Sequence, residues 1–144
     1  MRTTTPALAP AAAAALETWH AAVAARDLSA LPEILHPDAV FRSPVAYRPY
    51  RSAAAVELIL RTVITVFEDF TYHREFVGDD GQSVVLEFSA TVDGKSLTGI
   101  DMIRFDEAGL ITELEVMVRP LNGLQALGAR MAQALAAALP PDTS

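Results

Sequence analysis

The stretch ATVDGKSLTGIDMIRF, Ala90 to Phe105, decides how this chain folds. Apolar and polar residues alternate on both sides of Asp93-Gly94, a dipeptide that favours a two-residue hairpin turn. Such a turn fixes the register, so that Leu86 on the first strand lies opposite Asp101 on the second. Directly opposed residues share one face of a sheet. The pattern therefore predicts an antiparallel hairpin with an aspartate on its apolar face.

The next strand is expected to extend this apolar face. If the segment DEAG forms a four-residue loop, Phe105 lies opposite Leu110 and Asp101 lies opposite Leu114. Both loops give the same apolar wall, and a slip of one residue would exchange the two faces. The opposite face mixes polar and apolar residues, which suits solvent or a subunit interface. The expected wall around Asp101 consists of Val84, Leu86, Phe88, Ala90, Leu97, Gly99, Ile103, Phe105, Leu114, Val116 and Val118.

A carboxylate in an apolar wall is costly unless it reaches water, accepts hydrogen bonds or keeps its proton. Two interpretations of Asp101 stay open. In the first, Asp101 bonds a neighbouring group and only orders the core. In the second, it is an acid in a ligand cavity. Gly99, two residues earlier on the same face, favours the cavity, because a missing side chain leaves room beside the carboxyl.

Helical periodicity describes the first half of the chain and its end. Apolar spacing predicts a helix at 11–25, and Ser52 can cap another that runs to about Phe67. A short helix through Leu35 and a brief strand at 39–42 lie between them. A last helix is expected at 121–138, where it could cover the open end of the sheet as a lid or join a partner subunit.

Period-two alternation describes the remaining segments, and turn residues separate them. The predicted strands are residues 70–77, 83–92, 95–105 and 111–119. The fold class is therefore α+β: a cone-shaped, curved antiparallel sheet of four to five strands packed against three N-terminal helices, with an additional C-terminal helix. We expect one domain over 11–138, between flexible tails at 1–10 and 139–144.

Composition excludes several classes of function. The 144 residues carry a formal charge of -7, which disfavours nucleic acid and anionic membranes, because binding to phosphate depends on clustered Lys and Arg. No stretch approaches the length of a membrane span. The chain has no cysteine and only three isolated histidines, so we expect no disulfide, metal site or cofactor. The expected location is the cytoplasm.

Two segments carry a resemblance to a known family. The segment ARDLSALPEILHPDAVFRSPV near the front, and GIDMIRFDEAGLITELEV in the last two strands, resemble the nuclear transport factor 2-like superfamily over roughly residues 16–119. That superfamily includes ketosteroid isomerases, scytalone dehydratase, limonene-epoxide hydrolase and SnoaL-like polyketide cyclases. The resemblance implies the fold more strongly than the reaction, because one scaffold hosts many activities.

The resemblance to ketosteroid isomerase also implies site residues. The protonated aspartate of that enzyme's oxyanion hole, which is a standard example of a carboxylic acid kept neutral, falls on Asp101. The tyrosine donor on its first helix falls on Trp19, which donates through its indole N–H. Its general base falls on Ser43 in FRSPV, and a serine hydroxyl is no base at neutral pH. The Asp-Arg-Asp set of the epoxide hydrolases has no obvious counterpart.

Other candidates follow from register alone. Tyr72 is expected opposite Phe88, pointing to the cavity with its hydroxyl seeking a partner. By the same alternation His73 lies on the outer face. His20 follows Trp19 on the same helix and could serve as a base if it turned inward, but its place among alanines favours a helix surface or boundary. Tyr47 lies in a loop with several arginines, a segment that could recognise an anion at the mouth of the cavity or simply be solvated.

Two functions of different classes are therefore expected. The first is an isomerase, dehydratase or hydrolase that acts on a small hydrophobic ligand bearing a carbonyl or hydroxyl, with Asp101 as acid or hydrogen-bond donor. The second is a ligand-binding or dimeric interaction module of the same fold without turnover. In both, the chain is a homodimer. The expected ligand-binding residues are Trp19, Ser43, Tyr47, Tyr72, Leu86, Phe88 and Gly99.

Overall fold

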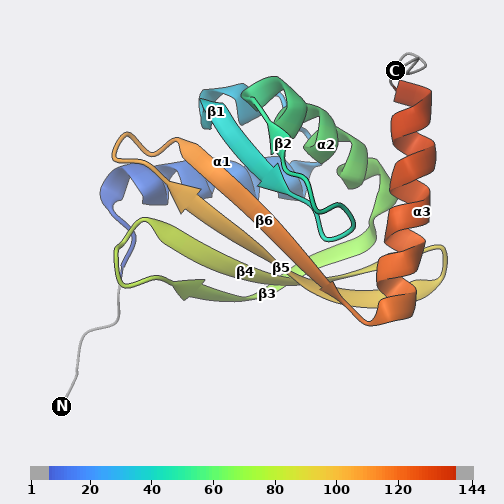
Figure 1. Ribbon diagram of the computed structural model, residues 1–144. Coiled ribbons are helices and arrows are strands. Elements are labelled where there is room, and N and C mark those ends of the chain that lie inside the picture. The colour runs from blue at the N-terminus through green and yellow to red at the C-terminus, as the bar shows by residue number, and fades with distance from the viewer. Residues whose placement is uncertain (1–6, 139–144) are drawn as a thin grey trace.

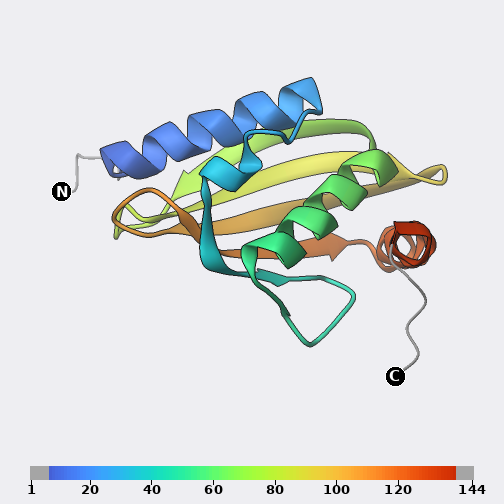
Figure 2. The same ribbon diagram turned by 90° about the horizontal axis from the view of Figure 1, so that it is seen from above.

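Two helices cover one face of a curved, open sheet in the computed structural model, which describes residues 7–138 (Figures 1 and 2). These helices are α1 (Pro10–Ala25) and α2 (Ala53–Val66). The helix α3 (Leu121–Ala138) stands at one end of the sheet (Figure 1). The α+β class predicted from helices followed by hairpins is confirmed.

The sheet has six strands, where the sequence predicted four to five. Their bounds are β1 (Leu35–Arg42), β2 (Tyr50–Arg51), β3 (Glu68–Val77), β4 (Ser83–Val92), β5 (Lys95–Phe105) and β6 (Ile111–Arg119). Their order is β2-β1-β6-β5-β4-β3. The sheet is mixed, because β1 pairs with β6 in the parallel direction while the other neighbours are antiparallel. The predicted purely antiparallel sheet is therefore wrong at β1, which reaches β6 through a long connection that includes α2 and the meander.

The β4–β5 hairpin has the predicted register. Leu86 pairs with Asp101 and Phe88 pairs with Gly99, in a ladder without interruption. The turn residues Asp93 and Gly94 both have positive φ, of 49° and 75°. This is the backbone shape of a turn whose twist matches that of the strands, and Asp-Gly accommodates it well. The local chemistry of two residues thus sets the face on which Asp101 lies.

The β5–β6 pairing differs from the prediction by two residues. Asp101 lies opposite Val116 rather than Leu114, and Phe105 pairs with Ile111 rather than Leu110. One residue of the shift comes from a longer loop, and the other from a register irregularity beside Arg104. Because the shift is even from Glu113 onward, the side chains of 113–119 keep their predicted faces. Ile111 lies before the irregularity, where the shift is a single residue, and it is buried opposite Phe105 instead of facing outward.

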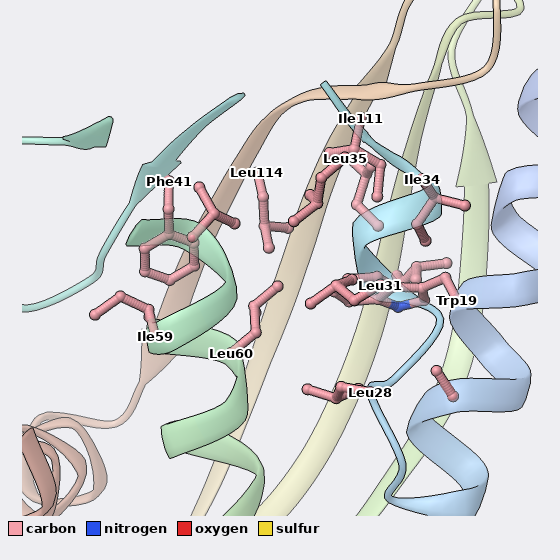
Figure 3. Packing of buried hydrophobic residues seen from close by; sticks show 14 of the residues in the cluster. Trp19, Leu28, Leu31, Ile34, Leu35, Phe41, Ile59, Leu60, Ile111 and Leu114 are labelled. Carbon is pink, nitrogen blue, oxygen red and sulfur yellow. The ribbon is translucent and has the colours of Figure 1, made fainter. Parts of the chain in front are cut away.

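The segment after α1 differs from the predicted short helix. It contains one 3-10 turn, η1 (Leu31–Glu33), so the sheet is covered by two α-helices and this turn. Leu31 from this turn is fully buried between α1 and α2, with Leu28 beside it (Figure 3). The strand β1 already begins at Leu35, earlier than the expected residue 39. The α2 helix begins at its predicted cap, where the Ser52 hydroxyl accepts a hydrogen bond from the Ala55 N–H at 3.2 Å.

The expected tails fall mostly outside the described residues, since 1–6 and 139–144 are not among them. Within the described part, the backbone N–H of Ala9 donates to the Gly81 carbonyl at 2.8 Å, and α1 begins at Pro10. The start of α1 is thereby tied to the β3–β4 loop.

Candidate functional site

A cavity of about 530 Å³ lies between the inner face of the sheet and the helices. The helix α2 contributes Ile59, Leu60 and Val63 to its wall, and α3 contributes Leu127 and Met131. The wall is mainly apolar, as expected for a site that takes a hydrophobic molecule. The helix α3 thus lines one end of the cavity. The sequence had offered two roles for this helix, a lid over the sheet or a contact with a partner subunit.

Three polar side chains form a chain of hydrogen bonds at the cavity wall. Trp19 on α1 donates from its indole Nε1 to the hydroxyl of Tyr72 on β3, at 3.0 Å. The Tyr72 hydroxyl in turn donates to Oδ2 of Asp101 on β5, at 2.6 Å. Asp101 is buried, with 7% of its surface exposed, and it lines the cavity. The residues that sequence reasoning singled out on three different elements therefore meet.

The second oxygen of Asp101, Oδ1, has no hydrogen-bond partner among residues 7–138. It is also not among the side-chain polar atoms sealed from solvent without a partner, since in the described part only Gln82 Oε1 is in that state. Because Asp101 is a wall residue of the cavity, Oδ1 is the carboxyl oxygen that is available to a molecule in the cavity.

Burial controls the protonation of this pair. Desolvation raises the pKa of Asp101 from 3.8 to about 7, and the hydrogen bond from Tyr72 opposes that rise. The pKa of Tyr72 is raised well above its ordinary value, chiefly by burial and then by the charge and hydrogen bond of Asp101. The Tyr72 hydroxyl consequently keeps its proton and serves as a donor. Asp101 is the group that changes its charge near neutral pH.

Three of the expected ligand-binding residues lie behind the cavity wall. Leu86 and Phe88 are buried at 1% and 0% exposure, and neither they nor Gly99 line the cavity. A Cβ on Gly99 would lie 2.5 Å from Cζ of Phe88, so the Phe88 ring fills the space that the glycine leaves. The expectation that Gly99 opens room beside the carboxyl is therefore wrong. Leu86, Phe88 and Gly99 form the packed layer that supports Asp101.

The loop between β1 and β2 separates the other two expected residues. Ser43 lines the cavity, and its hydroxyl accepts a hydrogen bond from the Val45 N–H at 3.1 Å. Val45 also lines the cavity, and its Cγ1 packs against Gly128 of α3. Tyr47 is fully exposed and contributes nothing to this wall. The expectation that Tyr47 contacts a ligand at the mouth of the cavity stays a prediction, and its full exposure fits the alternative of a solvated loop.

Sequence reasoning missed one polar contact at the cavity. His20 lines the cavity and packs its ring edge-on to Tyr72, with ring centroids 5.3 Å apart. Its Nε2 lies 3.1 Å from Oε1 of Glu75. The sequence favoured a helix surface or boundary for His20, with an inward-facing base as the alternative, and did not consider Glu75. Only the preceding Trp19 could have directed attention to this side of the helix.

Within residues 7–138, no group of three or more His, Asp or Glu side chains is arranged to hold a metal ion. None of the helices in the same part of the chain is long and apolar enough to span a membrane.

The sequence matches the family model of the SnoaL-like domain over residues 16–114. Since this match covers most of the chain, the protein belongs to the SnoaL-like family. The resemblance drawn from the sequence is thereby confirmed. No curated protein sequence matches the chain.

Solved structures agree with this family. A steroid delta-isomerase from Pseudomonas aeruginosa is 59% identical, with 94% of this chain and 98% of that chain covered and a TM-score of 0.91. An uncharacterized bacterial protein with a cystatin-like fold from Silicibacter pomeroyi is 30% identical, with 86% and 87% covered and a TM-score of 0.79. An NTF2-like protein of unknown function from Mesorhizobium loti is 20% identical, with 79% and 99% covered and a TM-score of 0.69, which supports the fold alone.

Proposed function

We propose that this protein is an isomerase that moves a double bond in a hydrophobic ketone, with Asp101 as the acid that stabilises the developing oxyanion. One observation carries the proposal: a chain of hydrogen bonds from Trp19 through Tyr72 ends on a buried carboxyl in an apolar cavity. Its similarity to a protein described as a steroid delta-isomerase favours isomerisation over the dehydration and hydrolysis that the sequence also left open.

The position of the Asp101 proton follows from the hydrogen bonds. Tyr72 donates to Oδ2, so in the neutral acid the proton belongs on Oδ1, the oxygen that meets a bound molecule. A pKa of about 7 leaves a large fraction of Asp101 protonated at neutral pH. A carbonyl oxygen that accepts this hydrogen bond is stabilised as it gains negative charge, and the surrounding apolar wall strengthens that interaction.

Turnover of a steroid ketone with a β,γ double bond tests the proposal, because conjugation of the product gives a rise in ultraviolet absorbance. We expect Asp101→Asn to lower kcat by roughly 100-fold or more while the protein stays folded, since the amide is a weaker donor to an oxyanion. Glu87→Gln is the matched control. Glu87 is a carboxylate on the adjacent strand that faces away from the cavity and pairs with Arg74, so its loss leaves kcat unchanged. A variant Asp101→Asn with the wild-type kcat would refute the role of Asp101.

A second function, ligand binding without turnover, is favoured by Ser43. This residue stands where ketosteroid isomerases have their base, and its hydroxyl accepts a hydrogen bond from the Val45 backbone. The two functions differ in one measurement. An isomerase converts the unconjugated ketone to the conjugated ketone, with a rise in ultraviolet absorbance, whereas a binding protein sequesters the ketone and leaves its absorbance unchanged.

We also propose that two copies of the chain associate through the outer face of the sheet. Phe76, Met102 and Met117 are large apolar residues that lie exposed on β3, β5 and β6. They share the face that the sequence assigned to solvent or a subunit contact, and exposed apolar groups of this size on one face favour association. A cytoplasmic location, which the composition favours, stays a prediction.

A further inference from the structure

His20 and Glu75 come from two elements that are far apart in the sequence, and they meet at the margin of the cavity. His20 lies on α1, one residue after Trp19, and is half-buried. Glu75 lies near the end of β3. The Nε2 of His20 is 3.1 Å from Oε1 of Glu75, and the imidazole is packed edge-on against the Tyr72 ring at an interplanar angle of 82°.

An irregularity in β3 brings Glu75 to this place. Tyr72 pairs with Phe88 and Glu75 pairs with Leu86, so three steps along β3 correspond to two steps along β4. In a regular strand, Tyr72 and Glu75 would point to opposite faces, because side chains alternate. The extra residue of the bulge puts both on the inner face. Bulges recur beside active sites, where they redirect a side chain in this way.

The contact with Glu75 selects one tautomer of His20. A carboxylate accepts hydrogen bonds, so the Nε2 of the imidazole carries the proton and Nδ1 carries the lone pair. Nδ1 has no hydrogen-bond partner among residues 7–138. Carboxylate–imidazole pairs of this kind orient the ring and stabilise the imidazolium that forms when the ring takes up a proton.

We propose that His20 is the proton acceptor of this site and that Glu75 positions it. This inference rests on the proposed isomerisation and supplies the base that Ser43 does not provide. The cavity then carries an acid and a base on either side of Tyr72: Asp101 at its hydroxyl and His20 at its ring. The substrates expected for such a site are β,γ-unsaturated ketones, which carry an acidic hydrogen on the carbon between the carbonyl and the double bond.

The reaction balances with these two residues. Nδ1 of His20 takes the proton from the carbon between the carbonyl and the double bond, and that C–H electron pair forms the new double bond of a dienol. The carbonyl oxygen takes up the proton of Asp101 or its hydrogen bond. His20 then returns its proton to the far carbon of the former double bond, while Asp101 recovers its own. The product is the conjugated ketone, and both residues end in their starting states.

Kinetics of His20→Gln on the same steroid ketone test the inference. We expect kcat to fall by about 100-fold or more with little change in KM, because the glutamine amide accepts no proton at neutral pH. His20→Ala should regain activity when free imidazole is added. His73→Gln is the matched control, since His73 lies on the outer face of the same strand as Glu75, with Nε2 2.7 Å from the Ser89 hydroxyl. This control should retain the wild-type kcat.

Glu75→Gln separates positioning from packing. Without the carboxylate, the imidazolium that forms on His20 loses the opposite charge that stabilises it. The acidic limb of the kcat/KM profile should then move to lower pH, and kcat should fall about tenfold. A purely structural contact would leave the position of that limb unchanged.

The outcomes distinguish this inference from the proposed function. If the wild type and His20→Gln both isomerise the ketone equally well while Asp101→Asn is inactive, His20 is not the base and the isomerase proposal survives. If the wild type binds the ketone and leaves it unconjugated, both fail. Should His20→Gln unfold, His20→Phe keeps an aromatic ring against Tyr72 and gives the same test. An active, folded His20→Phe would overturn the inference.

Discussion

Two carboxylates one step apart in the β4–β5 ladder have opposite environments. Leu86 pairs with Asp101, and the next residue, Glu87, pairs with Ile100 on the other face. Outside, two hydrogen bonds from Arg74 at 2.7 and 2.8 Å lower the pKa of Glu87. Inside, burial raises the pKa of Asp101 to about 7. The alternation of a strand, rather than the type of residue, therefore decides whether a carboxylate is a surface charge or an acid.

The largest expected effect is on the pH dependence of the free energy of unfolding, and it comes from Asp101. The folded chain holds the Asp101 proton up to about pH 7, whereas the unfolded chain releases it near 3.8. Between these values the folded state binds more protons, so the free energy of unfolding falls as the pH rises. The amide of an asparagine at this position does not titrate, and its oxygen can still accept the hydrogen bond from the Tyr72 hydroxyl. The stability of Asp101→Asn relative to the wild type should therefore rise by about 4 kcal/mol between about pH 4 and about pH 8.

Urea unfolding at several pH values measures this difference, and Glu87→Gln sharpens the comparison. Because the pKa of Glu87 is lowered, its contribution to stability is present above its ordinary pKa and disappears as the pH falls. The two variants should thus show pH dependences of opposite sign. A pH-independent difference between Asp101→Asn and the wild type would mean that Asp101 is ionised throughout.

A smaller effect is expected at Gly99, in the layer behind Asp101. An added Cβ would lie 2.5 Å from the Phe88 ring and 2.6 Å from the Met117 carbonyl oxygen, and backbone atoms cannot move aside cheaply. Gly99→Ala should lower the free energy of unfolding by about 2–3 kcal/mol, as overpacking does. Gly94→Ala is the control. Its Cβ meets nothing within 4 Å, so its cost comes from its positive φ alone and is about 1 kcal/mol. Equal losses in both variants would show that Phe88 does not need this space.

The sequence predicted the inner wall because a few local rules determine it. The Asp-Gly turn fixes the β4–β5 register, and hydrophobic alternation fixes the faces. The loop between β5 and β6 was harder to predict. There the Asp106 carboxylate accepts hydrogen bonds from the N–H groups of Ala108 and Leu110, which forms a longer turn than four residues. Only the even shift from Glu113 onward preserved the predicted faces of 113–119.

The parts of the site that escaped prediction depend on contacts between distant segments. The strand β3 contains a bulge, and no turn residue in the sequence indicates it. This bulge turns Glu75 toward His20. The parallel pairing of β1 with β6 likewise needs the whole chain to be in place. Trp19, Tyr72 and Asp101 could be predicted because alternation or family resemblance placed each of them. Their hydrogen bonds to one another depend on the packing of α1 against the sheet.

The smallest effect on the folded chain is expected on the outer face, at Met117. This residue is 47% exposed, so Met117→Lys should change the free energy of unfolding of a single chain by less than about 0.5 kcal/mol. If two copies associate through this face, the same change places like charges against each other in the dimer and desolvates them. In sedimentation velocity, Met117→Lys should then be a monomer, whereas the wild type should be a dimer. Leu121→Lys is the control, because Leu121 is 68% exposed at the start of α3 and belongs to no strand of the sheet. If the wild type sediments as a monomer, the proposed association through the outer face is wrong. Both substitutions would then affect the monomer alone.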